Sequence, residues 1–219
     1  MSQLSFIEIE PTLPANATVI WLHGLGASGH DFEPIVKELQ LPKEAAIRFI
    51  FPHAPEIAVT INAGYIMPAW YDILELTAER KINEAQLHDS VEEVKKLLQK
   101  ELDRGIKHER IILAGFSQGG AVAYHAALTY PKKLGGLLGL STYFPIADSI
   151  AREPINQNIP ILVCHGSEDQ MVLKEQGERT NNKLIELGYQ TKFKLYPMDH
   201  EICMQEVTDI STFIQKLLL

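Results

Sequence analysis

The chain has 219 residues and a formal net charge of −8. Hydrophobic residues make up 46% of it and charged residues 22%, a balance that suits one folded domain with a sizeable core and argues against disorder. Because an acidic surface repels phosphate backbones and anionic headgroups, we expect no nucleic-acid partner.

The N-terminal segment has no positively charged region followed by an apolar stretch, so it does not resemble a secretory signal. No apolar run approaches the roughly 18 residues that a membrane-spanning helix needs. The two cysteines, Cys164 and Cys203, cannot form a disulfide framework and do not have metal-ligand spacing. We therefore expect a soluble protein of the reducing cytoplasm.

Short apolar runs alternate with longer amphipathic segments, which is typical of a mainly parallel sheet with helices on both faces. In chain order we predict a strand at 17–22, a helix at 31–39, a strand at 47–51, a helix at 83–104, a strand at 110–114, a helix at 118–129, strands at 136–140 and 159–165, a helix at 174–187, a strand at 191–196 and a helix at 204–218. The helix at 83–104 has the clearest apolar period, and Gly105 follows it. The predicted fold is a single α/β domain over residues 1–219.

Residues 52–72 fit neither pattern, since they contain three prolines and have no sustained apolar period. A loop of this length inside a compact domain is uncommon and often functional, as a lid or a binding loop. The alternative is an irregular connection with one short strand or helical turn.

The strongest chemical signal is the pentapeptide Gly115-Phe116-Ser117-Gln118-Gly119, a G-x-S-x-G pattern between a predicted strand and a predicted helix. This spacing places a nucleophilic serine on a tight turn, where small neighbours leave room for the adjoining strand and helix. The simpler interpretation is a tight turn with an incidental serine.

A glycine-rich loop follows the first predicted strand, in the run His23-Gly24-Leu25-Gly26. A serine hydrolase needs two backbone donors for the oxyanion, one after the nucleophile and one from an early loop of this kind. We assign these donors to the amides of Leu25 and Gln118. The loop also resembles part of a nucleotide-binding loop, but it lacks G-x-G-x-x-G and a P-loop lysine.

A serine nucleophile also needs a histidine base and an orienting acid, which in this fold follow in the order Ser, Asp or Glu, His. His200 follows the last predicted strand, where the base belongs, whereas His165 ends a strand and is interpreted as structural. Asp169 directly follows a strand and is the preferred acid. Its competitors are Glu168, Asp148 and Asp199.

Together these residues resemble the carboxylesterase and acyl-protein thioesterase family, also called the phospholipase/carboxylesterase family. The segments that carry the resemblance are Trp21-Leu22-His23-Gly24-Leu25-Gly26, Phe51-Pro52-His53-Ala54-Pro55, Pro68-Ala69-Trp70-Tyr71-Asp72, Gly115-Phe116-Ser117-Gln118-Gly119-Gly120, Cys164-His165-Gly166-Ser167-Glu168-Asp169 and Met198-Asp199-His200-Glu201. The chain departs from the family in having Asp199, not glycine, before the histidine, and in lacking a Val-Val-Pro ending after Asp169.

The resemblance implies an α/β-hydrolase without a large cap that cleaves acyl esters or thioesters and needs no cofactor or metal. It implies Ser117, Asp169 and His200 as the triad, with Leu25 and Gln118 as oxyanion donors. The expected partners are small acyl esters or thioesters, acylated proteins or lysophospholipids, and a homodimer is an open option. Two alternatives are a small peptidase and a catalytically silent scaffold that binds a partner.

Within the segment 52–72 we expect Ile66, Met67 and Trp70 to line the acyl pocket or its rim, because so apolar a segment would be costly to expose fully to water. The alternative for Trp70 is a plain core anchor.

Overall fold

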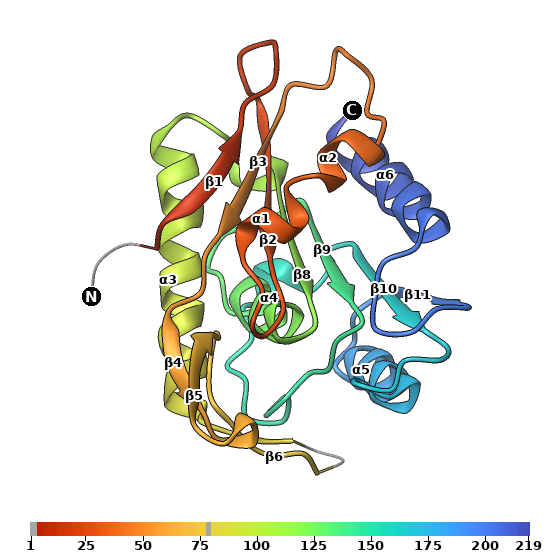
Figure 1. Ribbon diagram of the computed structural model, residues 1–219. Helices are drawn as coiled ribbons and strands as arrows, with labels where there is room; N and C mark the ends of the chain where they lie inside the picture. Colours follow the sequence, from red (N-terminus) through yellow and green to blue (C-terminus); the bar gives the residue numbers. More distant parts are fainter. Residues whose placement is uncertain (1–3, 78–79) are drawn as a thin grey trace.

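A seven-stranded sheet forms the centre of the protein in a computed structural model that describes residues 4–77 and 80–219 (Figure 1). In spatial order its strands are β1 (Phe6–Ile9), β3 (Ile47–Pro52), β2 (Ala17–Leu22), β8 (Ile111–Phe116), β9 (Gly136–Leu140), β10 (Ile161–Gly166) and β11 (Thr191–Tyr196). All neighbouring strands run parallel except β1, which pairs with β3 in the antiparallel sense.

Helices cover both faces of this sheet and enclose two hydrophobic cores. Residues of α3 (Glu84–Asp103), α4 (Gln118–Leu128) and α5 (Lys174–Glu186) share one core with the sheet. The other core contains α2 (Ile35–Glu38) and α6 (Met204–Leu218), and α1 (Gly29–Phe32) packs at its edge through Phe32. Alternate residues of each central strand enter opposite cores, as Ile20 and Trp21 of β2 do. Because both faces are buried, these strands are apolar at nearly every position.

The sequence predicted the fold class, the six parallel strands and most of the helices to within one or two residues. The helix expected at 31–39 is two short helices, since Pro34 lies between α1 and α2. Strand β1 was not predicted; it is half-exposed and pairs with the sheet only through β3.

The segment 52–72 is not irregular as expected. It forms a hairpin of β4 (Glu56–Val59) and β5 (Tyr65–Pro68), joined by the 3-10 turn η1 (Thr60–Asn62). The Asp72 carboxylate accepts hydrogen bonds from the Thr60 amide at 2.7 Å and the Thr60 hydroxyl at 2.6 Å, which ties the turn to the end of the segment. A second hairpin follows, of β6 (Ile73–Glu75) and β7 (Lys81–Ile82). Two more 3-10 turns are η2 (His108–Arg110) and η3 (Pro154–Asn156).

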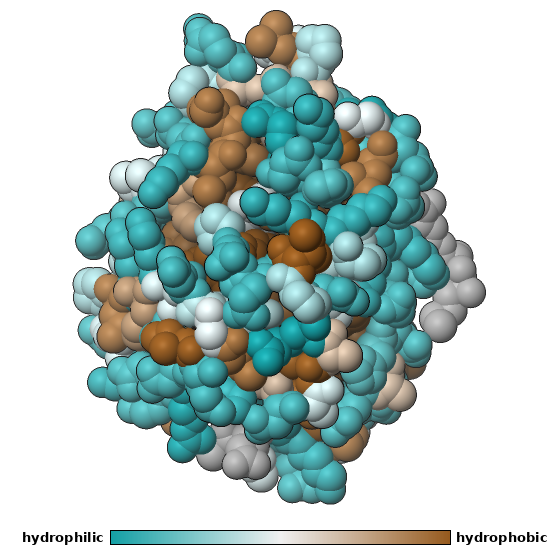
Figure 2. Space-filling view, turned by 180° about the vertical axis from the view of Figure 1, so that it is seen from behind, coloured by the Kyte–Doolittle hydropathy of each residue, from teal (hydrophilic) through white to brown (hydrophobic). Residues whose placement is uncertain are grey.

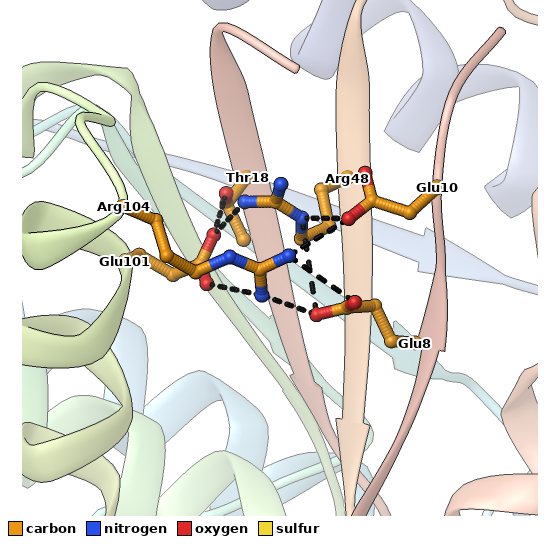
Figure 3. Close-up of polar contacts among 6 residues, drawn as sticks. All are labelled: Glu8, Glu10, Thr18, Arg48, Glu101 and Arg104. Atoms are coloured by element: carbon orange, nitrogen blue, oxygen red, sulfur yellow. Dashed lines mark hydrogen bonds and ion pairs between the residues drawn. The ribbon is translucent and has the colours of Figure 1, made fainter. Parts of the chain in front are cut away.

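An ion-pair network joins α3 to the strands at the edge of the sheet (Figure 3). Glu101 is completely buried, and its carboxylate accepts hydrogen bonds from the Thr18 hydroxyl at 2.6 Å and from Arg48 at 2.7 Å. The network also contains Glu8, Glu10 and Arg104. An ionised carboxylate is tolerated in the interior only when charges and donors of this kind surround it.

The face shown in Figure 2 is mainly hydrophilic, with hydrophobic residues in separate patches. Among the described residues, no helix combines the length and the apolar character that crossing a membrane requires.

Candidate active site

Ser117 occupies a strained turn between β8 and α4. Its φ of 54° and ψ of −122° lie outside the regions that residues other than glycine ordinarily adopt. The Ser117 amide donates to the Leu140 carbonyl at 2.9 Å, and the Thr142 hydroxyl donates to the Ser117 carbonyl at 2.6 Å. These two bonds fix the serine turn to the end of the neighbouring strand β9 and the loop that follows it.

The glycines two residues before and after Ser117 are required by close backbone contacts. A Cβ atom on Gly115 would overlap the backbone of Gly119 and Gly120, and one on Gly119 would overlap the carbonyl groups of Leu22 and His23. The G-x-S-x-G spacing therefore lets α4 start directly against the ends of β2 and β8.

The predicted triad residues form one continuous chain of hydrogen bonds. The Ser117 hydroxyl lies 3.0 Å from Nε2 of His200, and Nδ1 of His200 lies 2.7 Å from Oδ2 of Asp169. Oδ1 of Asp169 accepts from the amides of Met171 at 2.9 Å and Val172 at 2.8 Å. Burial alone would raise the pKa of Asp169, but the hydrogen bonds from His200 and these amides outweigh it and hold the pKa below its usual value. Asp169 is thus suited to remain ionised beside the imidazole.

Two residues that competed for these roles have other positions. Oδ1 of Asp199 accepts from the amides of His200 at 2.8 Å and Gln170 at 3.0 Å, so this carboxylate shapes the loop that carries the histidine. His165 is buried, and burial lowers its pKa. Its Nε2 lies 2.7 Å from the Val172 carbonyl and so supports the loop that carries Asp169.

The two expected oxyanion donors belong to residues that line the same cavity as Ser117. Gln118 is the first residue of α4, and Leu25 lies in the loop after β2. Strands β2 and β8 are neighbours, with Leu22 opposite Gly115, and this pairing brings the two loops together at one edge of the sheet. The amides at the start of a helix have no partner within the helix and can bind an anion.

The cavity has a volume of about 870 Å³ and contains Ser117 and His200 in its wall. Part of its lining is mainly apolar and comes from the hairpins and from two loops that follow sheet strands. It contains Ile61, Met67, Ile73, Leu76, Tyr143, Met171 and Val172, with Asn62 and Arg80 as polar members. Another part comes from α1, α2, the start of α6 and the residues just before it, and includes three carboxylates among apolar residues: Asp31, Phe32, Ile35, Glu38, Glu201, Ile202, Met204 and Val207.

Of the three residues expected to line an acyl pocket, the structure places only Met67 in the cavity wall. Ile66 is 72% exposed and points away, because successive residues of a strand face opposite sides. Trp70 is 1% exposed, and its indole N–H donates to the His23 carbonyl at 2.8 Å. The alternative of a core anchor therefore describes Trp70, and the pocket assignment is corrected for both Ile66 and Trp70.

Sequence reasoning missed much of the cavity wall, including Tyr143, Met171 and Met204. Each is an ordinary apolar residue in a loop or at a helix start, and no local pattern distinguishes it. Tyr143 and Met171 follow strands that end at the same edge of the sheet, and Met204 begins the last helix.

The sheet order, the strained serine turn and the Ser–His–Asp chain of hydrogen bonds define an α/β-hydrolase. Comparison with known proteins agrees, since residues 5–218 match the phospholipase/carboxylesterase family. A protein of Gibberella zeae named acyl-protein thioesterase 1 is 38% identical over 215 residues, covering 92% of this chain and 91% of that protein. Its namesake in Neurospora crassa is also 38% identical, over 92% of this chain and 87% of the relative.

Solved structures give the same result. SOBER1 of Arabidopsis thaliana has a TM-score of 0.87 and 34% identity, covering 94% of this chain and all of that one. Acyl-protein thioesterase 2 of Zea mays has a TM-score of 0.87 and 28% identity, covering 98% of this chain and 99% of that one. The chain belongs to the phospholipase/carboxylesterase family and is a carboxylic ester hydrolase.

Proposed function

We propose that Ser117, His200 and Asp169 hydrolyse acyl esters and thioesters through an acyl-enzyme intermediate. The observation that carries this proposal is the unbroken chain of hydrogen bonds from the Ser117 hydroxyl to the Asp169 carboxylate, at the wall of a cavity large enough for an acyl chain. The loss of any link would leave the serine hydroxyl a weak nucleophile.

In the proposed reaction, Oγ of Ser117 attacks the acyl carbonyl while Nε2 of His200 takes its proton. Asp169 accepts the hydrogen bond from Nδ1, which keeps the imidazole in the required tautomer and stabilises its charged form. The amides of Leu25 and Gln118 bind the oxyanion of the tetrahedral intermediate. His200 then gives its proton to the departing alcohol or thiol. In the second half of the reaction water attacks the acyl carbon while His200 takes one of its protons, and the bond to Ser117 breaks as His200 returns that proton to Oγ, which releases the carboxylic acid.

We assign the acyl chain to the mainly apolar part of the cavity wall, to which Met67, Leu76 and Met171 contribute. Burying each methylene there would gain about 0.8 kcal/mol. The leaving group then lies on the side of α1 and α6, where Glu38 and Glu201 would disfavour an alkyl chain. Because the fungal relatives are named acyl-protein thioesterases and match along most of their length, S-acylated protein is part of the proposed substrate range.

A fluorophosphonate probe and a panel of octanoyl oxoesters and thioesters test this proposal. Ser117→Ala should abolish labelling and lower kcat by about a million-fold, as removal of a triad serine does elsewhere. The matched control is Ser141→Ala, since Ser141 is also buried and its hydroxyl has no hydrogen-bond partner among the described residues. Native protein that neither reacts with the probe nor turns over any acyl substrate would instead indicate a silent scaffold.

A further inference from the structure

The segment 68–71 is hydrogen-bonded to the loop that carries Leu25 and to Gln118 at the start of α4, the two residues proposed as oxyanion donors. On one side, the Pro68 carbonyl accepts from the Gly26 amide at 2.8 Å, and the Trp70 indole donates to the His23 carbonyl at 2.8 Å. These bonds enclose Leu25 between two fixed points. The rings of Trp70 and His23 also pack together, with centroids 5.2 Å apart.

On the other side, the Gln118 side chain uses both of its polar atoms on the same segment. Its Oε1 accepts from the Trp70 amide at 2.8 Å, and its Nε2 donates to the Tyr71 carbonyl at 2.7 Å. The Gln118 side chain is 1% exposed, so these bonds have no competition from water. The Ser90 hydroxyl donates to the Trp70 carbonyl and fixes the segment to α3.

This connection matters because the sheet itself does not fix the distance between the two donors. Strands β2 and β8 are paired only as far as Leu22 and Gly115, and both donor residues lie beyond that point. A donor must lie within a few tenths of an ångström of its place to stabilise the oxyanion, and a shift of about 1 Å costs on the order of a hundredfold in rate.

We propose that Trp70, through its indole N–H, and Gln118, through its side-chain amide, are positioning residues that set the separation of the two oxyanion amides. The proposal rests on the proposed function, because it requires an oxyanion to form next to Ser117. It gives Trp70 a role that its burial alone does not imply, and one that differs from lining the acyl pocket.

Trp70→Phe tests the proposal, with Trp21→Phe as the matched control. Both tryptophans are almost completely buried, but the indole N–H of Trp21 has no hydrogen-bond partner among the described residues. Both variants therefore lose the same volume, and only Trp70→Phe loses a hydrogen bond to the donor loop. We expect kcat on an octanoyl thioester to fall about ten- to a hundredfold in Trp70→Phe, with KM within about threefold, and Trp21→Phe to keep kcat within about threefold.

A second measurement separates positioning from a general loss of structure. An octyl trifluoromethyl ketone forms an oxyanion on the serine, whereas the corresponding alcohol only occupies the cavity. We expect Trp70→Phe to lower the affinity for the ketone by the same factor by which kcat falls. The affinity for the alcohol should stay unchanged. Gln118→Met, which keeps the side-chain length and removes both hydrogen bonds, should behave in the same way and carries the test if Trp70→Phe does not fold.

Equal effects of Trp70→Phe and Trp21→Phe on kcat would overturn the proposal, as would parallel losses of ketone and alcohol binding. The Ser117→Ala variant distinguishes a failure of the positioning role from a failure of the proposed function. If Ser117→Ala is inactive and Trp70→Phe is fully active, the positioning role is wrong and the proposed function stands. If Ser117→Ala is active, the proposed function itself fails.

Discussion

Glu101 and Glu206 are both completely buried, and replacing each with glutamine should have opposite effects on stability. Glu101 lies in the network with Arg48, Arg104 and Thr18. Glu206 lies on α6, and neither of its carboxylate oxygens has a hydrogen-bond partner among the described residues. Burial raises the pKa of Glu206 to about 8. The backbone of Cys203 favours the charged carboxylate and lowers the pKa, but its effect is smaller than that of burial.

The size of the effect follows from the difference between folded and unfolded states. In the unfolded chain Glu206 loses its proton near its ordinary pKa of 4.5, whereas in the folded protein it keeps the proton up to about pH 8. The stability contributed by this group is therefore complete below pH 4.5 and is lost as the pH rises toward 8. At about 1.4 kcal/mol per pH unit, the loss between pH 5 and pH 7 is about 3 kcal/mol.

Glu206→Gln removes this titration but keeps the shape of the side chain. Urea unfolding at pH 5, 6, 7 and 8 should give nearly equal free energies for the variant and the parent at pH 5, and a growing advantage for the variant at higher pH. Taking the difference between the two proteins cancels every other titrating group. Glu101→Gln should instead lose roughly 3 kcal/mol across this range, because it removes the buried carboxylate that pairs with Arg48 and Arg104 and leaves them only the more exposed Glu8 and Glu10. Parallel stability curves for Glu206→Gln and the parent would refute the reasoning about this carboxylate.

Three further predictions concern the site. Asp169→Asn should lower kcat about ten-thousand-fold by favouring the wrong imidazole tautomer, whereas Asp199→Asn should cost about tenfold or less because asparagine still accepts both loop amides; the reverse ranking would transfer the orienting role to Asp199. Met67→Ala should lower kcat/KM for octanoyl esters about tenfold more than for acetyl esters, while Ile66→Ala, on the exposed side of the same strand, should change neither. Cys203→Ser should retain activity and raise the free energy of unfolding by about 0.5–1 kcal/mol, since serine is the better residue at the start of α6; a loss of activity like that of the nucleophile variant would show that the thiol takes part in the reaction.

Local patterns in the sequence were sufficient for the parallel sheet and for the order of the chemical groups. Strands buried on both faces are apolar at nearly every position, so β2, β8 and β9 were recognisable from their composition. The turn at Ser117 was recognisable because its neighbouring glycines are required by local crowding. The positions of Asp169 and His200 followed from the fold, because parallel strands bring the loops at their carboxyl ends to one edge of the sheet.

Features that depend on partners far away in the chain were not predictable in this way. The hairpin at 56–68 has no clean alternation of polar and apolar residues, because Met67 faces a cavity and Tyr65 and Ile66 face solvent. Strand β1 carries Glu8, and Glu10 follows it directly, both near an apolar sheet. Their charges pair with Arg48 of β3 and with Arg104, the residue that follows α3.

Trp70 shows most directly what the sequence alone determined and what the tertiary structure decided. Its apolar surroundings in the sequence indicated correctly that the side chain would avoid water, and they could not distinguish a substrate pocket from the core. The position of Trp70 in the core depends on two residues far away in the chain. The His23 carbonyl, 47 residues away, accepts from the indole N–H, and the side-chain oxygen of Gln118, 48 residues away, accepts from the Trp70 backbone amide. Hydrophobicity is a property of each residue and is visible in the sequence, whereas a hydrogen bond has a direction and exists only once folding has brought its two groups together.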